Sequence, residues 1–501
     1  MQRQTSPKFL YPRCVLIAAA LLLVCTKSSP LYPLNDWVDT NIYFTIGKGL
    51  MRGYVPYLDL YDQKGPVIYL LYGLGSLISS RTFFGIYVLE ALSFGAFLSV
   101  SHRIISLYSD RNALLALPVL GTLILSSMSV SHGGSLEEFC LPVFAYGLYS
   151  MLRYDRMDAP APLKMVFVNG LLAGLLLLSK FTLLSFYAAW MAVLLFWQCA
   201  RHSVRHGLAC CAVFVCAMLL TGVPWIVYFA ANDALPEFWH YYFYTNIFGY
   251  STLEAPVALN MLISIVKGTL ATLLRNPQYA LLIIGGLAYF TFARPGKLTR
   301  MGKIAVWSMF LLLPCGLYMG GQNYRYYGLT LAAFAPLGCV PLIALWNAHV
   351  APRLAGRRWA RMLPACLSVL GAGISLLVCG NVYLLGVAKE ETPQGRFAAA
   401  MEQSRSGDAV TLLCRAFPDS GFYLAANVIP SNRFFSSNNV MLPENAAEQV
   451  RLVEAGVPEF VITRNREDPP GPRYALIDTA DLPYENDLWT YRLYQRGKSG
   501  S

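Results

Sequence analysis

Long apolar runs recur along this chain of 501 residues, and no other feature constrains its fold as strongly. A helix needs about 20 apolar residues to cross roughly 30 Å of hydrocarbon, and many of the runs approach that length. The composition agrees, since 56% of the residues are hydrophobic and 13% are charged, whereas a soluble domain carries about 25% charged residues. The sequence therefore predicts an α-helical polytopic membrane protein.

About eleven transmembrane helices are predicted from these runs. They fall near residues 10–30, 84–106, 112–130, 139–152, 166–178, 182–198, 207–230, 278–293, 304–319, 329–346 and 363–386. The first run could be the core of a signal peptide, but Lys27 and Pro30 stand where a small-residue cleavage site would follow, so we interpret it as an uncleaved span. Residues 67–78 are apolar but too short to cross, and we expect an interfacial or re-entrant helix there.

Lysines and arginines gather in five short loops between the predicted spans. These residues are Arg103 and Arg111; Arg153, Arg156 and Lys164; Arg201 and Arg205; Arg294, Lys297, Arg300 and Lys303; and Arg353, Arg357, Arg358 and Arg361. Cytoplasmic loops are enriched in such residues, so the net charge of +11 indicates membrane orientation and not a nucleic-acid partner. We expect a multi-pass protein of the plasma (inner) membrane with a cytoplasmic N-terminus.

The same parity places every remaining loop on the extracytoplasmic face. These loops are residues 33–83, "SHGGSLEEF" (131–139), the turn around Lys180, the aromatic loop 231–277 and "GGQNYRYYG" (320–328). Any chemistry is therefore expected outside the cell membrane.

The tail after residue 386 has no long apolar run and carries 12 Lys/Arg against 15 Asp/Glu. "DAVTLLC" and "EFVIT" are typical of strands, and "GRFAAAMEQSR" and "NAAEQVRLVEAG" of amphipathic helices. The sequence therefore predicts a transmembrane module over residues 1–386 and a small extracytoplasmic α/β domain over 387–501. Only one of the 12 cysteines lies in this tail, so no disulfide is expected within it.

The first external loop concentrates charge in "DWVDTNIYFTIGKGLMRGYVPYLDLYDQKGP", residues 36–66. It contains two D-x-x-D pairs, Asp36/Asp39 and Asp59/Asp62. Apolar residues at a four-residue repeat predict an amphipathic helix from Asp39 to Met51 along the membrane surface, with Asp39 in its first turn. The alternatives are that Asp36 or Asp39 only caps this helix, and that Asp62 and Lys64 only form a surface ion pair.

Other external charges are more isolated. Glu137 and Glu138 follow "SHGG", Lys180 interrupts an apolar run, and Arg325 lies among tyrosines. A lysine within a membrane segment costs at least about 2.5–3.5 kcal/mol, so Lys180 is a functional candidate, although it could also snorkel from a turn. Arg325 could equally be an interface anchor. Carboxylates suit a general base, cations a phosphate leaving group, and aromatics a sugar face.

Several stretches resemble the GT-C superfamily of membrane glycosyltransferases, in particular the protein mannosyltransferase and aminoarabinose transferase group. Asp39 before "YFTIGKGL" and Asp62 before Lys64-Gly65-Pro66 match the two acids of that family's first loop, although relatives have His-Pro-Pro in place of Lys-Gly-Pro. "GGSLEEFCLPVFAYGLY" with Glu138 looks like its later acidic motif. "GLLAGLLLLSKFTLL" looks like its lysine-containing hairpin, and "YRYYGLTLAAFAPL" like its tyrosine-rich late span.

This resemblance implies a glycosyltransferase that moves a sugar from a polyprenyl-phosphate donor to an extracytoplasmic acceptor by an inverting single displacement, in cell-envelope glycan or glycoprotein modification. Asp39 would be the general base and Asp62 would orient a substrate. The expected remaining roles are donor-phosphate binding by Lys64, Lys180 and Arg325, and substrate contact by Tyr57 and Glu138. The expected partners are the donor, a glycan, lipid or protein acceptor, and the bilayer.

No metal site is predicted from motifs, although outside carboxylates could bind a hydrated divalent ion. The main rival is a non-enzymatic transporter or binding protein for lipid-linked glycans. Transporters usually contain inverted repeats, and none is visible in the sequence. A structural assembly protein is a third reading that leaves the external charges without a purpose.

Overall fold

The structure is a computed structural model, and it describes residues 7–109, 111–249, 257–293, 298–354, 356–407, 409–437, 442–466, 469–484 and 487–497. Among the residues named above, Arg294 and Lys297 and part of the loop 231–277 lie outside these ranges. Two compact units are present. We call residues 1–26, 87–225 and 252–383 the helical unit, and residues 27–86, 226–251 and 384–501 the mixed unit.

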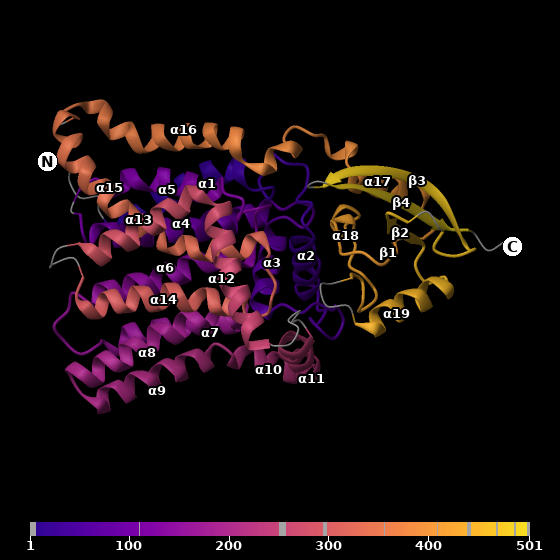
Figure 1. The fold of residues 1–501 in the computed structure, drawn as a ribbon. Helices are drawn as coiled ribbons and strands as arrows, with labels where there is room; N and C mark the ends of the chain where they lie inside the picture. Colours follow the sequence, from indigo (N-terminus) through magenta and orange to yellow (C-terminus); the bar gives the residue numbers. More distant parts are fainter. Residues whose placement is uncertain are drawn as a thin grey trace. The chain divides into compact units, whose positions relative to one another are not determined.

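The helical unit is built almost entirely of long apolar helices (Figure 1). They are α1 (Pro7–Cys25), α4 (Phe84–Ser106), α5 (Ala116–Leu125), α6 (Leu136–Tyr154), α7 (Leu163–Leu177), α8 (Leu184–Arg201), α9 (Val204–Leu220), α10 (Val223–Ala231), α12 (Val257–Arg275), α13 (Pro277–Phe292), α14 (Arg300–Tyr318), α15 (Pro336–His349) and α16 (Leu363–Val378). A 3₁₀ helix, Arg325–Phe334, leads into α15 with a bend of 46°.

Each of the eleven predicted spans coincides with one of these helical segments, and the prediction of a polytopic helical protein is confirmed. Six of the described helices are long and apolar enough to cross a membrane alone, and the bent pair makes a seventh. The others, such as α5 and α7, are apolar but shorter than the 18 residues required of a single span.

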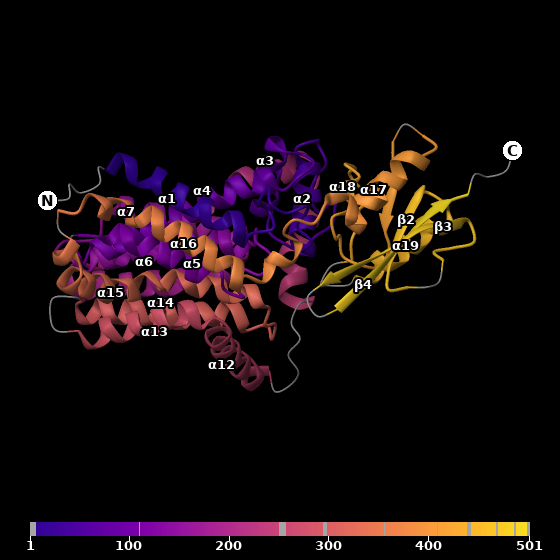
Figure 2. The same ribbon diagram turned by 90° about the horizontal axis from the view of Figure 1, so that it is seen from above.

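One of the six long helices, α12, lies in the predicted external loop 231–277. Its residues Ser264, Gly268 and Thr272, on successive turns, all meet a single residue, Tyr318 at the end of α14. A helix running alongside α14 would instead meet successive turns of it. α12 therefore crosses the end of α14 at a steep angle, as Figure 2 shows, which is the arrangement of a helix lying along an interface.

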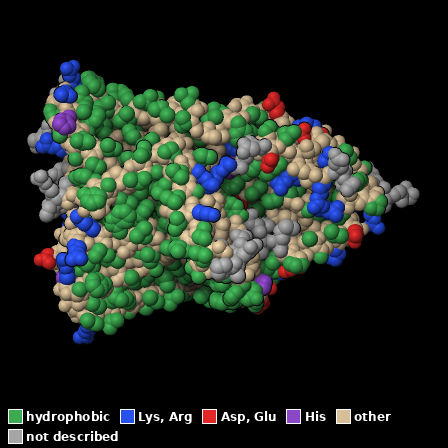
Figure 3. Space-filling model, in the orientation of Figure 1, with side chains coloured by type: hydrophobic (Ala, Val, Ile, Leu, Met, Phe, Trp, Pro, Cys, Tyr) green, Lys and Arg blue, Asp and Glu red, His purple; other side chains and the backbone are tan. Residues whose placement is uncertain are grey.

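The turns that carry the basic residues lie together at one end of the helical unit. In Figure 1 the C-terminal ends of α4, α6, α8, α13 and α15 and the N-terminal ends of the helices that follow them lie at the left. Figure 3 shows Lys and Arg side chains gathered at that end and hydrophobic side chains covering the helices beside it. The grouping of loops that the charge pattern predicts is thus present in the fold.

The mixed unit contains a four-stranded sheet in the order β1–β2–β4–β3. Its strands are β1 (Leu412–Cys414), β2 (Phe460–Arg464), β3 (Tyr474–Tyr484) and β4 (Asp487–Arg496), and its helices in this part are α17 (Pro393–Ser404), α18 (Phe422–Ala425) and α19 (Pro443–Glu454). β1 and β2 are parallel because α19 connects them, whereas the β3–β4 hairpin is antiparallel. The predicted small α/β domain is confirmed: its two expected strands are β1 and β2 and its two expected helices are α17 and α19, whereas the β3–β4 hairpin was not predicted.

Two helices of the first external loop, α2 (Val38–Leu50) and α3 (Pro66–Ile78), belong to this same unit. They pack through two glycines, since a Cβ on Gly47 would lie 2.5 Å from the backbone nitrogen of Gly73. The chain between them, residues 51–65, is therefore folded back over a short distance. At 13 residues α3 is about 20 Å long, shorter than the hydrocarbon core.

α2 differs from the predicted surface helix because protein covers all of its sides. Every residue from Asp39 to Gly49 is buried. One polar stripe packs on the segment 419–427: the Thr45 hydroxyl donates to Asp419 at 2.8 Å, and Lys48 Nζ donates to Asn427 at 2.7 Å. The amphipathic pattern of α2 was expected to place the helix along the membrane surface. In the structure its polar side contacts the C-terminal part of the mixed unit.

Candidate active site

A small pocket of the mixed unit brings together the residues predicted to carry the chemistry of the first loop. The first turns of α2, the residues just before α3 and two residues of the tail line it. Its lining residues are Val38, Asp39, Ile42, Tyr43, Asp62, Gln63, Lys64, Pro418 and Ser437. The two acids of the opening motif, 23 positions apart in the sequence, therefore share one site.

Asp39 is positioned by the first turn of α2. The helix begins after Trp37, whose own side chain makes no capping bond to it, and Asp39 is the acid of its first turn. Asp39 is 7% exposed, and the Tyr43 hydroxyl, one turn further on, donates to its Oδ2 at 3.3 Å. The Asp39 carboxylate is thus held by a residue of its own helix, and Asp39 also lines the pocket.

Asp62 lies deeper, at 4% exposure. The Tyr69 hydroxyl from α3 donates to its Oδ2 at 2.8 Å. Burial raises the pKa of Asp62 above its usual range, and the charge of Asp39 raises it further, whereas Lys64 and the Tyr69 hydrogen bond lower it. The two carboxyls thus influence each other electrostatically and differ in environment, which is how one site can give two acids separate tasks.

Lys64 is fixed through its backbone. Its carbonyl accepts a hydrogen bond from the Tyr57 hydroxyl (2.6 Å), and its N–H donates to the Tyr69 hydroxyl (3.1 Å). The Tyr57 ring is fully buried against Phe229 and Phe238, and its φ of 70° is unusual for a bulky residue. Tyr57, predicted to contact substrate, therefore positions Lys64 from behind. The strained backbone of Tyr57 thus lies in the same loop as Asp62 and Lys64.

The other acids of the first loop have structural partners. Asp36 forms an ion pair with Lys27 in which neither side chain is exposed. The Asp59 carboxylate accepts from the backbone N–H of Val55 at 2.7 Å and closes the turn before Tyr57. The alternative in which Asp62 and Lys64 form only a surface ion pair also fails, because Asp62 and its partner Tyr69 are buried.

A second cluster lies in the helical unit, around Lys180. This residue stands at the break between α7 and the 3₁₀ turn Phe181–Leu183. Its Nζ lies 2.9 Å from Glu137 Oε1 and 3.3 Å from the centre of the Tyr327 ring. The side chains of Lys180 and Glu137 are 16% and 2% exposed. Lys180 is thus a turn residue in a mostly buried ion pair, and not a lysine within a span.

The remaining predicted residues of this unit differ in their surroundings. Arg325 is exposed at the start of its 3₁₀ helix. Glu138 is fully buried, and its Oε2 accepts from the backbone N–H of Gly134 at 3.1 Å while its own N–H donates to Ser135 Oγ. Ser135 therefore caps the first turn of α6, and the Glu138 carboxylate holds the backbone just before the cap. Glu137, the adjacent acid, is the one that reaches Lys180.

Sequence reasoning therefore missed three partners of the predicted residues. Tyr43 could have been found from its spacing, since residues four apart share a helix face with Asp39. The S-x-x-E signature of residues 135–138 assigns Glu138 to capping and leaves Glu137 for other tasks. Tyr69 and Tyr327 carry no such local signal, because each meets its partner only through packing.

Within the described ranges, no group of three or more His, Cys, Asp or Glu side chains is arranged to hold a metal ion. The mixed-unit pocket supplies the carboxyls of Asp39 and Asp62, the ammonium group of Lys64 and the hydroxyl of Tyr43. A carboxylate beside a second carboxyl and a cation can accept a proton while an anionic group departs.

A scan of protein-family models finds no match, and neither does a search of the curated proteins. Solved structures do match. ArnT from Cupriavidus metallidurans bound to undecaprenyl phosphate aligns with a TM-score of 0.52 over 96% of this chain and 98% of that one, at 14% identity. The fold resembles ArnT from end to end.

ArnT in its apo state gives the same result, with a TM-score of 0.53, 14% identity, and coverage of 96% of this chain and 97% of that one. ArnT is an aminoarabinose transferase of the GT-C family. The resemblance to membrane glycosyltransferases of this type, predicted from the first-loop motifs, is confirmed at the level of the fold. At this identity the likeness to ArnT concerns the fold alone.

Proposed function

We propose that this protein is a membrane glycosyltransferase that transfers a sugar from a polyprenyl-phosphate donor to an acceptor on the extracytoplasmic face. The observation that carries the proposal is the meeting of Asp39, Asp62 and Lys64 in one pocket, on a fold shared along its length with ArnT. The ArnT structure that is bound to undecaprenyl phosphate supports a lipid-phosphate donor.

In this proposal Asp39 accepts the proton of the acceptor hydroxyl as its oxygen attacks the anomeric carbon. The bond from that carbon to the donor phosphate oxygen breaks with its electron pair, and the lipid phosphate leaves with inverted configuration at the sugar. Asp62, held by Tyr69, orients a substrate hydroxyl. Lys64 neutralises the departing phosphate, and Lys180 and Arg325 stay the other two residues predicted to bind it.

The extracytoplasmic orientation rests on charge. The basic turns gather at one end of the helical unit, and such residues favour the cytoplasmic side. The same argument puts the N-terminus inside and the sheet-containing tail outside. The protein would then act on lipid-linked sugars that have already crossed the inner membrane.

The rival function is export or binding of lipid-linked glycans without chemistry. The test uses purified protein in vesicles that contain radiolabelled polyprenyl-phosphate sugars extracted from membranes. The proposal predicts release of free polyprenyl phosphate together with labelled acceptor. Movement of intact lipid-linked sugar across the vesicle membrane, with no polyprenyl phosphate released, would contradict it and support the transporter.

A further inference from the structure

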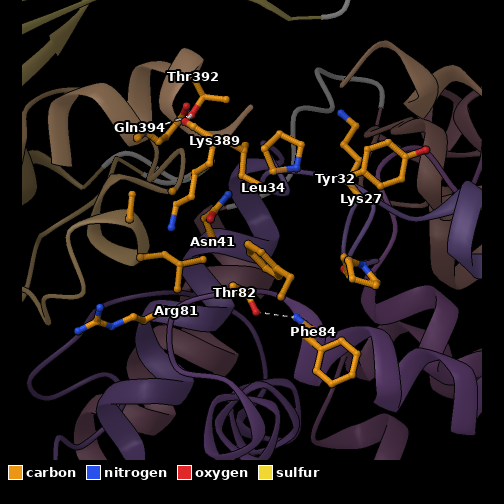
Figure 4. A pocket seen from close by; sticks show the side chains of 18 of the residues that line it. Lys27, Tyr32, Leu34, Asn41, Arg81, Thr82, Phe84, Lys389, Thr392 and Gln394 are labelled. Carbon is orange, nitrogen blue, oxygen red and sulfur yellow. Dashed lines mark hydrogen bonds between the residues drawn. The ribbon is translucent and has the colours of Figure 1, made fainter. Parts of the chain in front are cut away.

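A second and larger pocket of the mixed unit lies on the opposite face of α2 (Figure 4). Asn41 faces it, whereas Asp39 and Tyr43 face the candidate active site. At 100° per residue, Asn41 is turned about 200° from Asp39 around the helix. The two pockets have no lining residue in common.

Three chain segments form this second pocket. They are residues 27–34, which follow α1; residues 81–84, which lead into α4; and the region from Lys389 to Ala425. We call it the Arg81–Lys389 pocket. The first of these segments contains the end of the predicted span 10–30, and the second leads into the predicted span 84–106.

The charge of the Arg81–Lys389 pocket is positive. Lys27 is neutralised by Asp36, but Arg81 and Lys389 are exposed, and no acidic residue is among the described residues that line the pocket. Lys48 lies on the same face of α2, two turns beyond Asn41. Burial, together with the charges of Arg52 and Arg81, lowers the pKa of Lys48 to about 8. A bound anion would offset this concentration of like charge.

Two buried amide side chains of the pocket each lack an acceptor interaction. Asn41 is 1% exposed and Gln394 is 2% exposed, and within the described structure neither Asn41 Oδ1 nor Gln394 Oε1 has a hydrogen-bond partner. Their amide orientations are set by the other end. Asn41 Nδ2 donates to the carbonyls of Asn35 and Trp37, and Gln394 Nε2 donates to that of Ser420.

Buried acceptors without partners are rare because each costs about 1–3 kcal/mol. Two in one pocket indicate a ligand that donates hydrogen bonds. Figure 4 shows the side chains of Asn41 and Lys389 directed into the same space. The first turn of α17, with Thr392 as its cap, also lines the pocket and presents the positive end of a 12-residue helix.

From the two cations, the helix terminus and the two unpartnered carbonyls, we infer that the Arg81–Lys389 pocket binds a phosphate that carries hydroxyl groups, as in the headgroup of an anionic glycerophospholipid. The cations and the helix end receive the phosphate, and Asn41 and Gln394 accept from the hydroxyls. An ammonium-bearing headgroup satisfies the carbonyls but brings no net negative charge. A lipid source fits the chain segments next to α1 and α4.

The experiment measures lipid binding by the full-length protein in phosphatidylcholine nanodiscs. Phosphatidylglycerol is compared with phosphatidylmethanol, which has the same charge but no hydroxyl, and with phosphatidylethanolamine. We expect phosphatidylglycerol to bind at least tenfold more tightly than either. The double variant Arg81→Ala/Lys389→Ala should lose this preference, whereas Arg451→Ala, an exposed arginine elsewhere in the same unit, should keep it.

Soluble glycerol phosphate distinguishes the source of the ligand. If it binds the nanodisc-held protein as tightly as the lipid does, the ligand is a free polyol phosphate with the same chemistry. If it does not compete at millimolar concentration, the ligand is the lipid. Equal binding of all three lipids, or unchanged preference in the double variant, would overturn the inference. Asp39→Asn should leave this binding unchanged, so its outcome is independent of the proposed transferase activity.

Discussion

Tyr69 donates a hydrogen bond of 2.8 Å from its hydroxyl to the buried carboxyl of Asp62. The same hydroxyl lies 3.1 Å from the backbone nitrogen of Lys64. Tyr69 of α3 thus holds both the Asp62 carboxyl and the backbone of Lys64. The geometry of the pocket therefore depends on how α3 packs.

Replacing this hydroxyl should change the acidity of the site. In Tyr69→Phe the pKa of Asp62 should rise, because the hydrogen bond that lowers it is lost. We expect transfer to fall roughly tenfold or more, as a hydrogen bond to a charged group contributes about 1.5–3 kcal/mol. The limb of the pH–rate profile that reports an acidic group should move to higher pH. Tyr54→Phe in the same loop is the control, and an identical shift there would contradict the assignment.

The contact between α2 and α3 should not tolerate a methyl group. In Gly47→Ala the new Cβ would lie 2.5 Å from the nitrogen of Gly73 and 2.6 Å from the carbonyl of Tyr69, and backbone atoms cannot move aside alone. We expect a loss of about 1–3 kcal/mol in the free energy of unfolding. Activity should fall as well, because Asp39 and Asp62 separate.

The matched control for this substitution is Gly285→Ala in α13, where nothing lies within 4 Å of the added carbon. It should be neutral or stabilise by up to about 1 kcal/mol, since alanine favours a helix more than glycine does. Thermal unfolding in detergent compares the two. Equal effects would show that the glycine contact between α2 and α3 is not tight.

The Lys180–Glu137 pair should behave as a unit. Lys180→Met leaves a carboxylate that is 2% exposed without its ammonium partner, and breaking a buried pair costs about 3–5 kcal/mol. The double variant Lys180→Met/Glu137→Gln should regain most of that loss. Lys267→Met, at an exposed position, serves as the control. Additive effects of the two single substitutions on unfolding would argue against the coupling.

Because Asp419 is buried, we expect the stability of the mixed unit to depend on pH. Burial raises its pKa to about 6 from 3.8, although the Gly421 N–H and the Thr45 hydroxyl oppose the shift. Between these values the folded chain holds a proton that the unfolded chain has released. The free energy of unfolding should therefore be highest near pH 4 and fall by roughly 3 kcal/mol as the pH rises past 6.

In Asp419→Asn the contribution of Asp419 to this pH dependence should disappear, because the side chain no longer ionises. Asp481→Asn, at an exposed position, should leave it in place. Melting temperatures measured from pH 4 to pH 7 separate the two variants. A wild-type curve that is flat in this window would contradict the assigned burial of Asp419.

The helices were predictable because crossing a membrane imposes a length and a composition, and the basic turns add orientation. The site was predictable only in part. Asp39 and Asp62 stand in a local motif, and the pocket confirms that they meet. Tyr43 shares a helix face with Asp39 and follows from its spacing, whereas Tyr69, Glu137 and Tyr327 meet their partners through packing that no local pattern encodes.

The sequence predicts α2 at the membrane surface, and the structure buries it, for a physical reason. Lys48 and Thr45 have the spacing of a solvated helix face, and a sequence does not distinguish a face that meets water from one that meets a polar protein surface. Here the partners are Asp419 and Asn427, more than 370 positions away. The C-terminal tail therefore completes the fold of the first loop.

The most direct measurement is the initial rate of sugar transfer by Asp39→Asn from polyprenyl-phosphate donors in reconstituted vesicles. The account predicts a fall of about 10²-fold or more, as expected for loss of a general base, with binding of polyprenyl phosphate retained. Asp59→Asn, which changes an exposed acid of the same loop, should keep the wild-type rate. A folded Asp39→Asn protein that transfers sugar at the wild-type rate would contradict the account.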